Sequence, residues 1–152
     1  MQKKSILKVP STAVSAFLLC SGLLLLASSA RAEYCNNATL IGAYGYHAEG
    51  ALSPAPNVSL TFRSVGMTHF DGSGHVTWVE HTVIGGVSLA PGFTPAKGTY
   101  TVNSNCTGSA VINTPNSPVP LHLSFVVEKD GRLVHSVLST DAVSTEFTKV
   151  DE

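Results

Sequence analysis

The chain has 152 residues, with 9 Lys plus Arg, 10 Asp plus Glu and a formal net charge of -1. Four of the basic residues lie within the first 32 residues, which hold no acid, so the rest of the chain has a net charge near -5. This charge excludes nucleic-acid binding through a basic surface, because phosphate neutralisation needs clustered Lys and Arg.

Residues 1–32 have the pattern of a cleaved secretory signal peptide. A basic start with Lys3, Lys4 and Lys8 precedes an apolar stretch over residues 13–27, and the small-residue exit Ala30-Arg31-Ala32 follows. A bilayer span needs about 20 apolar residues, and this stretch is shorter and interrupted. We therefore expect residues 33–152 to form a single domain that is secreted or periplasmic and has no membrane span.

Cleavage of the leader removes Cys20 and leaves Cys35 and Cys106 as an even pair in an oxidising compartment. Such a pair predicts a disulfide. The closed loop would hold about 70 residues, and loop-entropy arguments give such a bridge on the order of 4 kcal/mol of stability. A zinc or redox site is disfavoured because the two thiols lack C-x-x-C spacing.

From Leu40 onward, segments rich in Val, Thr, Tyr, Phe and Ile alternate with Gly, Pro, Asn and Asp, which predicts an all-β fold. Eight strands joined mostly by short turns favour an antiparallel up-and-down meander closed into a barrel. The link that starts at Gly85-Gly86 runs through Pro91, Gly92 and Pro95 and cannot be a central strand. We expect strands over residues 40–52, 58–70, 75–84, 97–103, 108–114, 119–129, 132–140 and 143–150.

The Asp130-Gly131 pair is typical of a two-residue hairpin turn and lets the strand faces be assigned. If Lys129 pairs with Arg132, the two strands share one apolar face, which we interpret as the interior. His122 and His135 then face solvent, as do Val126 and Val137. The predicted interior residues are Leu121, Leu123, Phe125, Val127, Val134 and Leu138.

The hairpin around Asp71-Gly72-Ser73-Gly74 is less decisive. In the simple even register Val65 lies opposite Glu80, Met67 lies opposite Trp78, and Arg63 lies diagonally from Glu80. A glycine bulge would shift the pairing by one residue. The polar residues of this hairpin are therefore the ones that we expect to line a cavity.

The order of motifs resembles secreted bacterial proteins with an allene oxide cyclase-like barrel. The resemblance rests on Cys35 and the segment 38–46, then on FDGSG, GTYTV and NCTG in that order, and on a closing TDAV. It implies an eight-stranded, calycin-like barrel with an internal cavity, and it leaves dimers and trimers both open. It carries no catalytic motif onto this chain, and fold does not imply function.

No hydrolase elbow, phosphate loop, H-E-x-x-H or C-x-x-C motif occurs in the sequence. His47 with Glu49 and His69 with Asp71 share strand faces and supply two metal ligands each, fewer than a metal site usually needs, so we predict neither metal nor cofactor. Glu80 and His81 point to opposite faces and cannot act together. Glu80, with Arg63, is the candidate general base, and a solvated ion pair is the alternative.

Aromatic side chains on the predicted strands can line a small-molecule pocket with flat apolar rings and, for tyrosine, hydroxyl groups. Ordinary packing in the core is the alternative interpretation of these aromatic residues. The leading hypothesis is an exported barrel that binds a small, largely apolar molecule in its interior. A cofactor-independent cyclase or isomerase and an envelope-associated structural module without ligand are the alternatives, and a homo-oligomer stays open. The candidate ligand-binding residues are Tyr44, Tyr46, Phe62, Trp78 and Tyr100.

Overall fold

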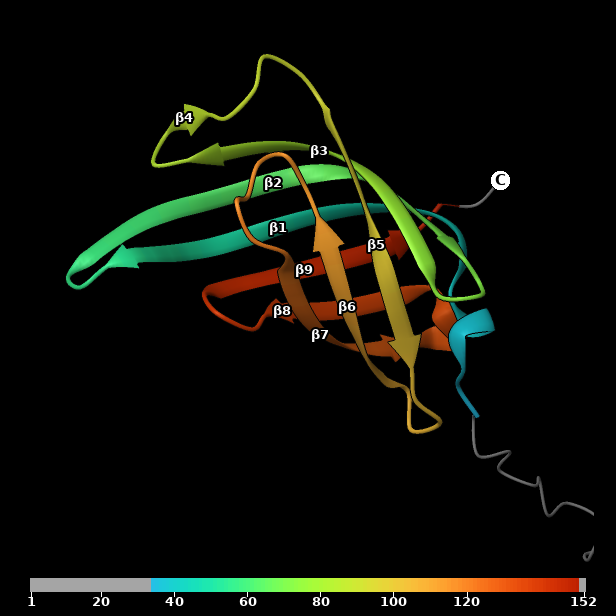
Figure 1. Cartoon of the computed structure of the whole chain (residues 1–152). Coiled ribbons are helices and arrows are strands. Elements are labelled where there is room, and N and C mark those ends of the chain that lie inside the picture. Colours follow the sequence, from blue (N-terminus) through green and yellow to red (C-terminus); the bar gives the residue numbers. More distant parts are fainter. Residues whose placement is uncertain (1–33, 151–152) are drawn as a thin grey trace, which may run out of the picture. The chain divides into compact units, whose positions relative to one another are not determined.

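The computed structural model describes residues 34–150, so the predicted signal peptide and Cys20 lie outside the described residues. Almost all of the described chain is extended (Figure 1). Its elements are η1 (Asn37–Thr39), β1 (Ile41–Ala55), β2 (Val58–Asp71), β3 (His75–Ile84), β4 (Val87–Ser88), β5 (Thr94–Val102), β6 (Thr107–Asn113), β7 (Leu121–Glu128), η2 (Lys129–Gly131), β8 (Leu133–Leu138) and β9 (Ala142–Lys149).

The strands form one antiparallel sheet that closes on itself. Its order is β2-β1-β9-β8-β7-β6-β5-β3-β4, and the additional pairing of β2 with β3 closes the ring. Every strand of the ring therefore pairs with its neighbours along the chain, with β9 returning to β1. Within residues 34–150 this confirms the predicted eight-stranded meander, to which the two-residue strand β4 is added on β3. Closure leaves few exposed edges.

The β7–β8 hairpin has the predicted register. Val127 pairs with Val134 and Leu123 with Leu138. Asp130 and Gly131 both have positive φ, at 55° and 80°, as the primed-turn signal requires. The predicted interior side chains are buried or half-buried, and Val126 and Val137 are exposed, as expected.

The simple register predicted for the β2–β3 hairpin is wrong by one residue. Gly66 pairs with Glu80, and Thr68 pairs with Trp78. The turn spans an additional residue because one oxygen of Asp71 accepts from the backbone amides of Ser73, Gly74 and His75 at 2.8 to 2.9 Å. The bulged alternative is therefore the one that the chain adopts.

This shift also separates Arg63 from Glu80. Arg63 pairs with Val83 and lies on the outer wall, where its guanidinium is 3.7 Å from the carboxylate of Glu49. Glu80 lies on the inner wall and is 5% exposed. The predicted diagonal contact between Glu80 and Arg63 is thus absent, because the one-residue shift places their side chains on opposite faces.

Pro95 lies inside β5, although the sequence excludes a central strand there. Its segment pairs with β3 through Val79, whereas pairing with β6 begins only at Lys97 opposite Asn113. Pro95 therefore sits where β5 has a neighbour on one side only. A proline that donates no hydrogen bond is compatible with that position.

One end of the barrel is closed by the segment that precedes β1. The hydroxyl of Tyr100 donates to the carbonyl oxygens of Asn37 and Leu40, and the hydroxyl of Tyr44 donates to that of Gly131. Leu40 and Tyr44 are fully buried. The predicted disulfide between Cys35 and Cys106 is present and ties this segment to the turn between β5 and β6.

Candidate functional site

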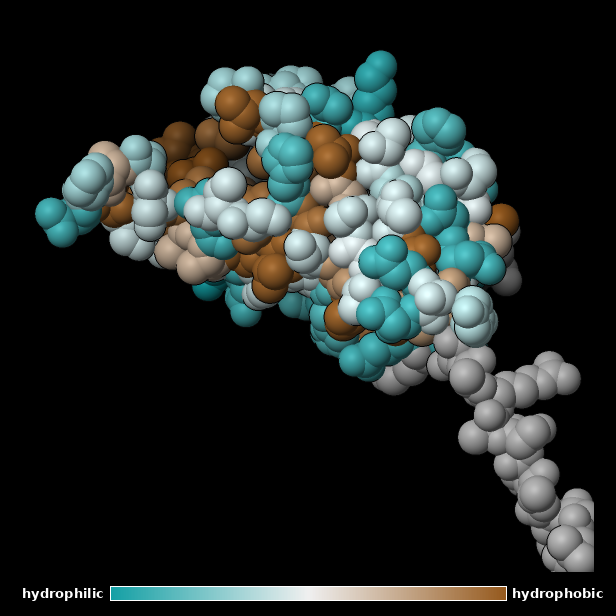
Figure 2. Space-filling model, turned by 60° about the horizontal axis from the view of Figure 1, so that its bottom comes forward, coloured by the Kyte–Doolittle hydropathy of each residue, from teal (hydrophilic) through white to brown (hydrophobic). Residues whose placement is uncertain are grey.

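The opposite end of the barrel holds a pocket of about 320 Å³. It lies between the β1–β2 hairpin, which projects beyond the other strands in Figure 1, and the loops that follow β3, β6 and β8. Figure 2 shows brown, hydrophobic surface gathered beside this projecting hairpin. The apolar side chains of the wall are Leu52, Phe62, Ile84, Leu89, Leu121 and Leu138, with Pro118, Val119 and Pro120 at the rim.

Glu80 is the buried charged residue of this pocket. Its strand, β3, directs Trp78, Glu80 and Thr82 inward by the period of two. The Thr114 hydroxyl and the Asn116 side-chain amide, the latter at 2.9 Å, both donate to Oε1 of Glu80. No donor within residues 34–150 reaches its second oxygen, Oε2. Protein donors therefore hold one of the two carboxylate oxygens of Glu80.

Neutral polar groups continue from Glu80 along the inner wall. The hydroxyls of Ser64 and Thr82 are 3.0 Å apart and buried. Burial raises the pKa of the Tyr46 phenol above its ordinary range, a hydrogen bond with Ser64 opposes this shift, and the nearby charge of Glu80 adds to it. Gly66, opposite Glu80, leaves room for the Tyr46 ring, because a Cβ there would lie 2.7 Å from it.

The aromatic residues named from the sequence divide into three positions. Phe62 lines the pocket itself. Tyr46 and Trp78 lie beneath it, around an inner cavity of about 40 Å³ that shares Phe62, Leu121 and Leu138 with the pocket. Cavities of that size hold little more than water, so the lower barrel is filled by side chains.

Tyr44 and Tyr100 lie deeper still, at the closed end. Both pack edge-on against Phe70, with ring centroids 5.2 and 5.0 Å apart. Their hydroxyls are engaged by backbone carbonyls, as described above. Trp78 differs, since its Nε1 is buried without a hydrogen-bond partner within residues 34–150.

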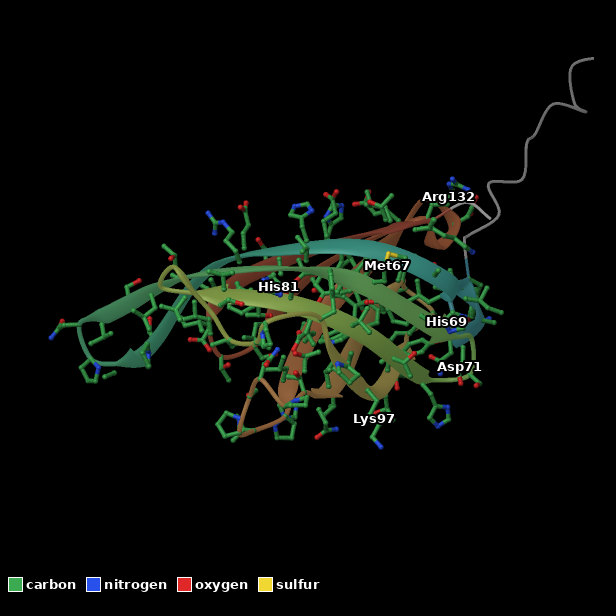
Figure 3. The ribbon with its side chains drawn as sticks, turned by 90° about the horizontal axis from the view of Figure 1, so that it is seen from above. Met67, His69, Asp71, His81, Lys97 and Arg132 are labelled. Carbon is green, nitrogen blue, oxygen red and sulfur yellow. A yellow bond between two sulfur atoms is a disulfide. The ribbon has the colours of Figure 1, made fainter. Side chains whose placement is uncertain are left out.

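The histidine and carboxylate pairs noted in the sequence lie outside the barrel. His69 and Asp71 sit at the end of β2 away from the projecting hairpin (Figure 3), and His47 and Glu49 are exposed on β1. Within residues 34–150 no three His, Cys, Asp or Glu side chains come together as a metal site would require. His81 faces away from Glu80, as predicted, and contacts the carbonyl of Gly92 at 3.2 Å.

The outer wall also carries a broad depression of about 800 Å³ across β1, β9, β8 and β7. His135 is one of its lining residues and lies 3.7 Å from Glu146 and 3.8 Å from Glu128. The exposed Val126 and Val137 belong to the same surface. Its charged side chains are all at least partly exposed, whereas the mouth pocket holds the buried Glu80.

Sequence reasoning missed Thr114 and Asn116, which lie in the proline-rich loop after β6. No strand period applies within a loop, so their contact with Glu80 could not be deduced. Ser64 and Thr82 were within reach of the sequence, since the bulged register places them on the face of Trp78. The signal was the Asp71 turn, whose extra residue reverses the faces.

Comparison with family models, with curated proteins and with solved structures finds no match to this chain. The eight-stranded barrel that the resemblance implied is present within the described residues. None of the helices within residues 34–150 has the length and apolar character needed to cross a bilayer.

Proposed function

We propose that this protein binds a small, largely apolar molecule in the mouth pocket of the barrel. The observation that carries the proposal is the combination of leucine, isoleucine and phenylalanine walls with one buried carboxylate, Glu80. Ligand pockets are typically apolar, with a few polar groups that orient the ligand. The volume of about 320 Å³ is at the lower limit of such pockets, which favours a ligand smaller than most drugs.

We also propose that the protein acts outside the cytoplasm, as a member of the allene oxide cyclase-like barrels. The leader pattern in residues 1–32 and the Cys35–Cys106 disulfide support export, since disulfides persist in oxidising compartments. The eight-stranded meander and the order of the motifs support the family. Detection of a mature N-terminus after residue 32 in the periplasm or medium of the native host tests the export.

The binding proposal is tested with octan-1-ol as the probe, followed by amide shifts in NMR spectra. We expect saturable shifts of the amides of Phe62, Glu80 and Thr114. Leu138→Trp fills the pocket and is expected to abolish them. Val137→Trp is the matched control, because this neighbouring residue is 53% exposed on the outer wall. Equal loss in both variants, or no saturable shift in the unmodified protein, overturns the proposal.

A second candidate function is a cofactor-independent isomerase or cyclase. The observation that favours it is that two donors hold Oε1 of Glu80 in the pocket wall while no donor within residues 34–150 reaches Oε2, an arrangement compatible with a positioned general base. Oε2 would take a proton from one carbon of the substrate and return it to another, so substrate and product have equal mass. Chromatography after incubation with unsaturated substrates tests this, with Glu80→Gln expected to abolish conversion.

A further inference from the structure

We infer that the ligand of the mouth pocket is cationic, an amine with an apolar body whose ammonium group binds Oε2 of Glu80. This inference rests on the binding function proposed above and names its ligand class. It follows from three features of the pocket: the charges of its lining, the partners of Glu80 and the depth at which Glu80 lies.

The charge of the lining is one-sided. Glu80 and Asp141 are its two acidic residues, and no Lys, Arg or His within residues 34–150 lines the pocket. A carboxylate or phosphate ligand would enter without a counter-charge and against two negative groups, at a cost set by like-charge repulsion in a poorly solvated site. The lining therefore disfavours fatty acids and other apolar anions.

The partners of Glu80 are neutral. Thr114 and Asn116 donate to Oε1, and no cationic side chain within residues 34–150 lies against either oxygen. Glu80 is only 5% exposed. A buried carboxylate is costly unless it is paired, so a cation supplied by the ligand meets a need that the described protein leaves open. Neutral donors hold the carboxylate in place, and Oε2 is available for an ammonium N–H.

Depth sets the shape of the ligand. Glu80 is 5% exposed, whereas Asp141 is half-buried, nearer the surface, and accepts from the backbone amide of Ser53 at 3.1 Å. The apolar residues Phe62, Leu121 and Leu138 line the same pocket. An ammonium group at Glu80 with a short hydrocarbon chain along these side chains would pair with the carboxylate and contact the apolar part of the wall.

The test compares three probes that share an eight-carbon chain and differ in their heads: octylamine, octan-1-ol and octanoate. Titration calorimetry of the disulfide-bonded protein at neutral pH gives the three affinities. We expect octylamine to bind at least tenfold more tightly than octan-1-ol, and octanoate to bind more weakly than both. Octan-1-ol binding without preference for the amine overturns this inference and leaves the binding function standing. No binding of any probe overturns both.

Two variants locate the charge that is responsible. Glu80→Gln keeps the shape of the side chain and is expected to reduce octylamine affinity at least tenfold more than octan-1-ol affinity, so that the preference for the amine is lost. Asp141→Asn, nearer the surface, is expected to change octylamine affinity by less than threefold. A larger effect of Asp141→Asn than of Glu80→Gln contradicts the assignment to Glu80. If Glu80→Gln does not fold, the three-probe comparison in the unmodified protein still decides the inference.

Discussion

The two ends of this barrel differ in the side chains that fill them. At the closed end, aromatic rings pack against one another and their hydroxyls are bound by backbone carbonyls, as Tyr44 and Tyr100 illustrate. At the open end, the inner wall changes to Ser64, Glu80 and Thr82, and proline-rich loops replace strands. Backbone carbonyls therefore bind the two tyrosine hydroxyls of the closed end, whereas at the open end no donor within residues 34–150 reaches Oε2 of Glu80.

This difference implies that stability and ligand binding depend on opposite ends of the barrel. Well-packed interiors respond strongly to lost atoms, because cavities form that cannot collapse. Pocket walls are already solvent-accessible and lose less when they are trimmed. Residues at the closed end are therefore expected to determine unfolding, and residues at the open end to determine affinity. The following predictions are designed to break that separation.

A matched pair of phenylalanines gives the largest expected effect. Phe70 is buried among Tyr44, Tyr100 and Phe147, whereas Phe62 is half-buried and lines the pocket. Phe70→Ala is expected to lower the free energy of unfolding by up to about 5 kcal/mol, and Phe62→Ala by about 1 kcal/mol. Denaturant unfolding followed by the fluorescence of Trp78 measures both. Octan-1-ol affinity should fall only for Phe62→Ala. A larger loss of stability in Phe62→Ala, or a loss of affinity only in Phe70→Ala, would contradict the proposed difference between the two ends.

The disulfide is expected to rank next. Removing the Cys35–Cys106 bridge, which links residues 71 positions apart, is predicted to cost about 4 kcal/mol, because the unfolded chain regains the entropy of an open loop. The double variant Cys35→Ser/Cys106→Ser avoids mispaired thiols, and denaturation with and without reductant provides a check. Under conditions where the variant remains folded, we expect unchanged octan-1-ol affinity. A loss of affinity would show that the closed end positions the pocket.

The Tyr44 hydroxyl tests the closed end at a single hydrogen bond. Tyr44→Phe removes the donor to the Gly131 carbonyl, for an expected loss of about 1–2 kcal/mol at neutral pH. Tyr34→Phe, at a residue 80% exposed, is the control and should be neutral. Unfolding free energies at neutral pH measure both changes. An equal effect in the two variants would contradict the prediction that the Tyr44 hydroxyl stabilises the closed end.

The same variant has a pH signature. Burial raises the pKa of Tyr44 to about 12 from its ordinary value near 10, with the neighbouring Tyr100 adding to the shift. A raised pKa means that the stabilisation is complete below pH 10 and is lost as the pH rises towards 12. The alkaline loss of stability should therefore be smaller in Tyr44→Phe than in the unmodified protein. Stability curves of the two proteins above pH 9 provide the comparison.

The fold was largely within reach of the sequence, because strand parity and turn chemistry are local. Asp130-Gly131 determined the register of one hairpin, and the observed pairings of Val127 with Val134 and of Leu123 with Leu138 follow from that single turn. Pro95 shows where a local rule fails. Excluding it from a central strand assumed that a neighbouring strand pairs with it on each side. The number of neighbouring strands at one residue depends on the whole sheet and is not a local property of the sequence.

The candidate site was only half predictable for a similar reason. Glu80 and Phe62 could be named from their strands, but the partners of Glu80 come from a loop more than thirty residues away. The mistaken partner Arg63 followed from one uncounted turn residue, since a shift of one exchanges the two faces of a strand. Contacts between a strand and a distant loop have no period in the sequence from which they can be read.

That uncounted residue leads to the smallest predicted effect. The hydroxyl of Ser73 and the amide of His75 are the main causes that lower the pKa of Asp71 below its ordinary range. A lowered pKa means that this stabilisation is present above the unfolded value near 4 and is lost as the pH falls through the folded one. Asp71→Asn should therefore flatten the acid limb of the stability curve slightly, because Asp71 is exposed and solvent weakens its interactions.

The register of the β2–β3 hairpin tests the role of Asp71 more directly than the stability curve does. Asp130→Asn is the matched control, since Asp130 also precedes a glycine in a hairpin turn but, within residues 34–150, accepts none of these hydrogen bonds. If the Asp71 turn holds the extra residue, Asp71→Asn should weaken the cross-strand contact between the amides of Thr68 and Trp78 in NMR spectra. An unchanged contact would mean that the inward placement of Trp78 and Glu80 is enforced by the barrel itself, with the turn only following.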